Sequence, residues 1–249
     1  MPNRRLPNST PAVLRTFQTA HDTYLLTPVA SERAITAEQF AQLDLTVPTS
    51  LFSRFKKEAS EVDLALAAQA PLSSDLAVKV ARLTLFVSHF HQVLDLGIVR
   101  GDFAVGARTF YGRDITATTL PDLTTYVAVA EAAQKIVDGE TARATAEGAS
   151  YQAMALPSAA EVGSVLTAYK AAASASQTAT LKTDQERENV SELYPEAQEL
   201  AVDLCDTIEF FYRKDPSDGS RRTKCQRWGV VYLFDTAATP VVTPPVVVP

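Results

Sequence analysis

The stretch between Ser73 and Gly101 constrains the fold of this chain more than any other, because its apolar residues recur at helical spacing throughout. The periodic positions are Leu76, Val80, Leu83, Phe86, Val87, Phe90, Leu94 and Ile98. They fall on more than one face of the predicted helix, as expected for a central helix of a bundle. Arg100 followed by Gly101 is typical of a helix C-terminus.

The composition extends this prediction to most of the chain. Glycine, a poor helix former, occurs only 9 times in 249 residues, while alanine, the best one, is abundant. Periodicity predicts six helices, at about 12–27, 49–69, 73–99, 122–147, 158–182 and 185–213. Pro71 should separate the second helix from the third, and Pro195 should kink or break the sixth.

The connecting and terminal segments follow different patterns. Thr36-Ala-Glu-Gln is typical of a helix start, but Pro48 leaves the fold of residues 31–48 open. Asp215 begins a predicted turn, and Val230 to Phe234 form the one predicted strand. The proline- and valine-rich tail at 239–249 cannot be helical, so it should be extended.

A shift of 114 residues aligns two predicted helical hairpins without a gap. It places Leu51, Phe52 and Phe55 on Val165, Leu166 and Tyr169, and Leu83, Phe90, Leu94 and Ile98 on Ala197, Leu204, Ile208 and Tyr212. Two amphipathic hairpins can match by period alone, which leaves chance similarity as the alternative. We predict an all-α bundle of two pseudo-repeated three-helix halves, whose apolar faces bury one another.

The predicted organisation follows from these elements. It comprises an N-terminal arm (1–11), a first helical half (12–101), a connector (102–121), a second helical half (122–214), a turn with a short strand (215–238) and the tail (239–249). At this length the chain can bury a sizeable core without metals or disulfides.

Charge and cysteine content narrow the classes of function. A net charge of −6 argues against nucleic acid as a main partner. The chain lacks an apolar run of membrane-spanning or signal-peptide length, so a cytoplasmic location is the default, with export by a leaderless route left open. Cys205 and Cys225 are expected as free thiols, with a single disulfide as the alternative.

Several short motifs resemble a family of uncharacterised bacterial proteins. They are Arg5 to Asn8 in an RLPN start, Ala81 to Leu94 in an ARLxxFxSHFxQVL helix, Arg100-Gly101, Tyr111-Gly112 with Pro121 to Leu123, and a C-terminal CQRWGVVYLF. The resemblance implies an all-helical protein. It carries no functional residue, because none of the motifs is a catalytic signature.

The titratable residues offer little chemistry. His89 and His91 are two apart, so on a helix they point in different directions and cannot share a metal ion. His91 and Asp95 share a helical face, and we predict that any ligand-binding site lies near this pair. No catalytic residue, metal site or cofactor is predicted, because carboxylate–histidine, nucleophile and phosphate-loop motifs are all lacking.

The C-terminal region carries the clearest functional hint. Basic residues gather around Trp228, and the uncharged tail is rich in valine, a composition that favours contact with a partner over solvation. The predicted interaction residues are Arg221, Arg222, Trp228, Val241, Val242, Val246, Val247 and Val248. We therefore expect a non-enzymatic structural or interaction protein that meets copies of itself, or another protein, through its termini. The alternative is a bundle that binds a small molecule or peptide between its halves.

Overall fold

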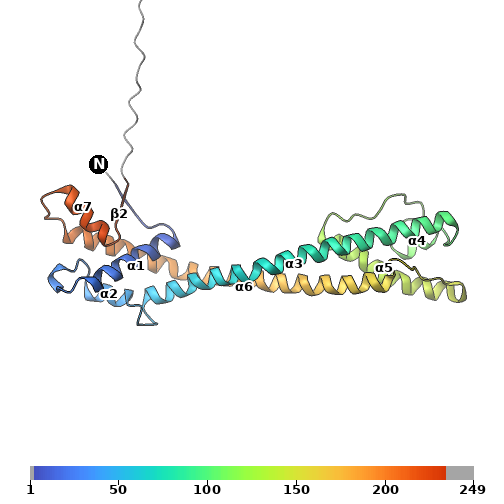
Figure 1. The fold of residues 1–249 in the computed structure, drawn as a ribbon, viewed down its shortest axis with the longest axis horizontal. Helices are drawn as coiled ribbons and strands as arrows, with labels where there is room; N and C mark the ends of the chain where they lie inside the picture. Colours follow the sequence, from blue (N-terminus) through green and yellow to red (C-terminus); the bar gives the residue numbers. More distant parts are fainter. Residues whose placement is uncertain (1–2, 234–249) are drawn as a thin grey trace, which may run out of the picture. The chain divides into compact units, whose positions relative to one another are not determined.

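The computed structural model describes residues 3–233 and is predominantly helical (Figure 1). In chain order the elements are β1 (Asn3–Arg5), α1 (Thr10–Leu26), α2 (Ala37–Leu43), α3 (Leu51–Arg100), α4 (Ala107–Phe110), α5 (Tyr126–Glu147), α6 (Ala159–Phe211), α7 (Asp218–Arg227) and β2 (Val231–Leu233). Single 3₁₀ turns occur at Ala30–Glu32 and Gly148–Ser150. The predicted all-α bundle with a short C-terminal strand is confirmed.

Two long helices replace four of the predicted ones. Pro71 lies inside α3 and Pro195 lies inside α6, so the predicted break at Pro71 is wrong. A proline within a helix removes one backbone hydrogen bond and costs about 3 kcal/mol. Apolar side chains are buried on both sides of each proline, for example Ala65 and Val80 around Pro71. The buried side chains nearest to Pro71 are Ala65 and Val80, six and nine residues away, so the helix is held in place by its parts on either side of the proline.

The chain forms two compact units that do not follow the predicted halves. Unit 1 comprises Met1–Asp63 and Gln185–Pro249, and unit 2 comprises Leu64–Asp184. The predicted boundary between halves at residues 102–121 therefore falls within unit 2. The difference follows from the unbroken long helices, because α3 and α6 each contribute one part to unit 1 and the other part to unit 2.

The core of unit 1 joins the two ends of the chain. Aromatic residues from α1 and α3 meet edge to face, with the ring centroids of Phe17 and Phe52 5.6 Å apart. The same core takes Ala197, Leu204 and Ile208 from α6, and Cys225, Trp228 and Val230 from α7 and the segment after it. Cys205 and Cys225 are both buried there as free thiols, and burial raises the pKa of Cys205 to about 11.

Unit 2 has its own core, built from one continuous stretch of sequence. It contains Leu83, Val87, Phe90 and Leu94 of α3, Val129, Ala133 and Ile136 of α5, and Val162, Val165 and Leu166 of α6. The short helix α4 packs against α5, and the Tyr111 ring after it contacts Phe90 at 4.9 Å. The helix predicted as central to the bundle is thus central to this core.

The 114-residue shift correctly relates the buried positions of the two units. Five core positions on α3 coincide with core positions on α6, namely Leu83 with Ala197, Val87 with Ala201, Phe90 with Leu204, His91 with Cys205 and Leu94 with Ile208. The element order also repeats, since a helix, a long helix and a short helix (α1, α3, α4) are followed by α5, α6 and α7. The two units therefore use a similar helical framework.

Three elements of unit 1 were predicted only in part. Thr36 caps α2 through a reciprocal pair of hydrogen bonds with Gln39, which confirms the helix start at this position. Helix α7 lies where a turn and a strand were expected, and Ser217 caps it. The predicted strand is confirmed as β2, and it pairs antiparallel with β1, so the N-terminal arm forms a strand of its own.

Candidate functional site

The structure does not support a ligand site at His91 and Asp95. His91 is fully buried, and neither of its ring nitrogens has a hydrogen-bond partner. Burial, together with the nearby charge of Arg113, lowers the pKa of His91 to about 4, so the imidazole is neutral near pH 7. His91 and Asp95 therefore share a helical face without a hydrogen bond between them.

Asp95 instead receives two arginine side chains. Arg108 Nε lies 2.8 Å from Asp95 Oδ1, and Arg113 Nη1 lies 3.0 and 2.9 Å from the two carboxylate oxygens. Burial opposes ionisation of Asp95, but the hydrogen bonds from Arg108 and Arg113 outweigh it and lower the pKa. Arg113 also donates to the backbone carbonyls of Ala117 and Thr119, which fixes the connector after α4. We assign Asp95 a structural role.

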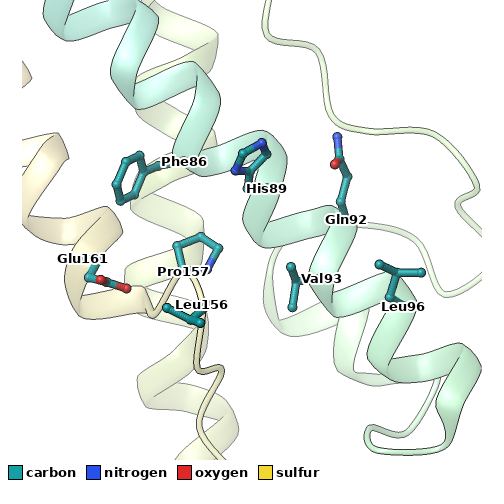
Figure 2. A pocket seen from close by; sticks show the side chains of 8 residues that line it. All are labelled: Phe86, His89, Gln92, Val93, Leu96, Leu156, Pro157 and Glu161. Atoms are coloured by element: carbon teal, nitrogen blue, oxygen red, sulfur yellow. The ribbon is translucent and has the colours of Figure 1, made fainter.

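The neighbouring face of the same helix carries a groove that the sequence prediction missed by two residues. It has a volume of about 390 Å³ and opens between α3 and the start of α6 (Figure 2). Its lining residues are Phe86, His89, Gln92, Val93, Leu96, Leu156, Pro157 and Glu161. Four of them recur at helical spacing on α3, at 86, 89, 93 and 96. Of these four positions, only Phe86 belonged to the periodic apolar set of the sequence analysis.

Three polar side chains, His89, Gln92 and Glu161, line this otherwise apolar groove. His89 lies on α3 between Phe86 and Gln92 (Figure 2). Glu161 accepts hydrogen bonds from the backbone N–H and the hydroxyl of Ser158 at 2.7 and 2.9 Å. Those hydrogen bonds lower the pKa of Glu161, so the groove carries a negative charge near pH 7. A largely apolar groove with a few polar groups is the usual form of a binding site.

A second candidate surface is the two-stranded sheet of unit 1. Asn3, Arg4 and Arg5 pair with Leu233, Tyr232 and Val231. The central pair, Arg4 and Tyr232, contacts α6. Arg4 forms ion pairs with Asp206 and Glu209, and the Tyr232 hydroxyl donates to Glu209 at 2.6 Å. The flanking apolar side chains, Val231 and Leu233, stay 42% and 51% exposed. The outer face of the sheet therefore carries Val231 and Leu233 beside the exposed Asn3 and Arg5.

Predicted interaction residues Arg221 and Arg222 lie beside this sheet. They line a groove of about 570 Å³ together with Asn3, Arg4, Glu209, Phe210, Arg213, Asp218 and Tyr232. Arg213 stacks over the Phe210 ring at 3.5 Å, and Arg221 pairs with Asp218 at 2.9 Å. Four arginines against two carboxylates give the groove an excess of positive charge.

The remaining predicted interaction residues have different outcomes. Trp228 is only 2% exposed, and its indole N–H donates to the Tyr212 hydroxyl at 3.0 Å. Its assignment to an interaction surface is therefore wrong, because the core of unit 1 takes up the ring. Val241, Val242, Val246, Val247 and Val248 lie outside the described residues.

Two further polar clusters were not predicted. In unit 2, the buried Arg143 lies over the rings of Phe103 and Tyr151 at 4.9 and 5.1 Å. Glu140, one turn earlier, accepts hydrogen bonds from the hydroxyls of Tyr111 and Tyr151. A charged residue on a helix gives no local signal of this burial. Arg143 also forms an ion pair with Glu140 at 3.5 Å, which joins these residues into one cluster.

The other cluster is acidic and lies in unit 1. Oxygen atoms of Glu58, Glu61 and Glu186 approach within 4.8 Å of one another. Lys57 forms ion pairs with Glu58 and Glu61 at 3.2 and 3.0 Å, and Asn189 donates to Glu58 and Glu186. These cationic and amide partners already satisfy the carboxylates, so the cluster gives no reason to assign a metal ion.

Comparison with known proteins adds no assignment. No family model, curated protein or solved structure matches the chain. The resemblance to uncharacterised bacterial proteins stays a prediction. Among the described residues, no helix combines the length and apolar content needed to cross a membrane.

Proposed function

We propose that this chain is a non-enzymatic structural or interaction protein that associates with copies of itself through its two ends. The terminal sheet supports this proposal most directly, because it joins both ends of the described chain at one surface. A sheet with exposed strand edges is a template for the addition of a further strand.

The edges of β1 and β2 are the feature that would accept a partner. Within residues 3–233 the sheet has two strands, so each strand has one edge without a β-partner. Two strands are marginally stable by themselves, and a third strand would complete their backbone hydrogen bonds. The tail at residues 239–249 is uncharged and rich in valine, a residue that favours strands.

Charge supports a second copy as the partner. The groove beside the sheet carries an excess of arginine, whereas the chain as a whole has a net charge of −6. Opposite charges on two surfaces favour their encounter and set their orientation. An acidic copy of the same chain fits this groove better than a basic partner.

Sedimentation velocity over a concentration series tests the proposal. We expect the full chain to form assemblies at high concentration, and a chain ending at Leu233 to stay monomeric. Replacing Val246, Val247 and Val248 with serine keeps the length of the tail, and it should weaken assembly at least tenfold. A full-length chain that remains monomeric throughout the series would refute the proposal.

Surface variants separate the sheet edge from a general effect of exposed apolar residues. Val231→Lys places a charge on the sheet, where the side chain is 42% exposed, and it should reduce assembly. Val127→Lys on α5 is the matched control, because Val127 is 65% exposed and lies in unit 2. Equal loss of assembly in both variants would contradict a role for the terminal sheet.

A further inference from the structure

The two units differ most in the segment that connects a first helix to the long helix after it. In unit 1, residues 27–50 connect α1 to α3 and contain α2. In unit 2, the shorter segment 148–158 connects α5 to α6 and contains only a 3₁₀ turn. Unit 2 therefore has no counterpart of α2, although the rest of its framework corresponds to that of unit 1.

In unit 1, α2 covers a defined face of α6. The Gln39 side-chain amide donates to Asp203 at 2.6 Å and to Thr207 at 2.9 Å. Gln39 and Leu43 are both buried by this contact and by the surrounding core. On its other side, Phe40 stacks on Tyr24 of α1 at 4.0 Å. The helix thus fills the space between α1 and α6.

The corresponding face in unit 2 is the groove of Figure 2. The 114-residue shift that relates the buried positions of α3 and α6 relates Asp203 to His89 and Thr207 to Val93. Both His89 and Val93 line the groove. On α3, the groove therefore lies at positions that correspond to the face of α6 contacted by α2.

We propose that this groove binds a short amphipathic helix of a partner protein, in the place that α2 occupies in unit 1. The lining positions 86, 89, 93 and 96 run along one side of α3 for about three turns, which matches the length of a short helix. Apolar anchors spaced three or four residues apart on the partner fit such a surface.

The polar groups of the groove define the chemistry of the partner helix. On the partner helix, a residue whose side chain forms hydrogen bonds, such as glutamine, faces His89. This contact corresponds to the one between Gln39 and Asp203 in unit 1. Leucine or a residue of similar size contacts Phe86, Val93 and Leu96. A lysine or arginine on the partner pairs with Glu161, whose carboxylate is charged and lies at the rim.

A peptide with the sequence of residues 33–47 of this chain, held helical by a side-chain lactam, is a direct probe. Fluorescence anisotropy of the labelled peptide against the full-length protein measures binding. We expect saturable binding to the wild-type chain. Leu96→Asp should weaken binding at least tenfold, because this 56% exposed side chain lines the groove without supporting the core.

Leu85→Asp is the matched control. Leu85 lies on the same helix and is 50% exposed, but it does not line the groove, so its substitution should leave peptide affinity unchanged. Absence of binding to the wild-type chain would overturn the proposal. So would binding that Leu96→Asp leaves intact, since the peptide would then be exchanging with α2 in unit 1.

Discussion

At the scale of single residues, unit 2 keeps several polar nitrogen atoms buried without hydrogen-bond partners. They are both ring nitrogens of His91, Nε of Arg113, and Nε and Nη1 of Arg143. A buried polar group without a partner costs about 1–3 kcal/mol. For His91 the cost stays at this level only while the ring is neutral, because a buried charge next to Arg113 is far less favourable.

His91 should therefore make the stability of unit 2 depend on pH. Its pKa is about 4 in the folded chain and 6.5 when unfolded, so the unfolded state binds more protons between these values. Stability is highest above pH 6.5 and falls as the pH decreases toward 4. From pH 7 to pH 4.5 the expected loss is about 2 kcal/mol, at about 1.4 kcal/mol per pKa unit. Urea unfolding at both pH values measures it.

His91→Leu is the informative variant for this prediction. Leucine removes the titrating group and suits the apolar contacts of the site. The loss of unfolding free energy between pH 7 and pH 4.5 should therefore be about 2 kcal/mol smaller than in the wild-type chain. His89→Leu is the control, because His89 is exposed at the groove. An unchanged pH dependence in His91→Leu would show that other groups cause the acid sensitivity.

Sequence patterns predicted residue burial well where the pattern is periodic, and poorly where it depends on distant partners. Phe90 and Leu94 were predicted in the core and lie there. Asp95 was paired with His91 because they are neighbours on the helix. The arginines that bind it come from a connector 13 and 18 residues away, and their approach leaves no periodic signal.

At the scale of helices, close packing depends on one glycine. Gly139 lies on α5, where a Cβ atom would come within 2.2 Å of the Phe110 carbonyl oxygen at the end of α4. Backbone atoms cannot move aside as a flexible side chain can. The contact between α4 and α5 therefore requires a residue without a side chain.

Two alanine substitutions should have opposite effects for this reason. Gly139→Ala should destabilise unit 2 by about 1–3 kcal/mol through overpacking. Gly163→Ala in α6 should stabilise it by about 0.5–1 kcal/mol, because alanine favours the helix and the nearest atom, Val137 Cγ2, is 3.4 Å away. Thermal unfolding followed by circular dichroism measures both changes. Destabilisation in both variants would contradict the packing argument.

Helix boundaries show what local sequence rules leave out. The Thr36 capping motif correctly marked the start of α2, because a cap depends only on nearby residues. Pro71 was expected to end a helix on the same kind of local rule, but α3 continues through it. Helix α7 was missed because its sequence, DGSRRTKCQR, has almost no apolar residues to show a period.

At the scale of the whole molecule, the 114-residue shift matches buried positions of α3 with buried positions of α6, but the two compact units do not follow the predicted halves. The repeat is a pattern of buried positions, and the same pattern occurs again 114 residues later in the chain. Which copy of a helix packs with which neighbour is not encoded in that pattern. Only the continuity of α3 and α6 shows that unit 1 takes its parts from both ends of the sequence.

The two units should differ in their ability to fold as fragments. Unit 2 is a continuous segment, Leu64–Asp184, with its own core, and it should unfold cooperatively when expressed alone. Residues 1–63 alone should stay largely unfolded, because their partners in the core come from α6 and α7. Circular dichroism and urea titration of both fragments test this. A cooperatively folded 1–63 fragment would contradict the division.

The core of unit 1 combines residues from both ends of the chain, and this has a consequence for biosynthesis. During translation, the first 63 residues leave the ribosome well before residues 185 onward, which complete their core. At about 5–20 residues per second the delay is roughly 6–24 s. Throughout that interval Phe17, Phe52 and Phe55 have no α6 to cover them. The nascent N-terminus therefore exposes apolar side chains until α6 is made, whereas unit 2 is a continuous segment and can fold earlier.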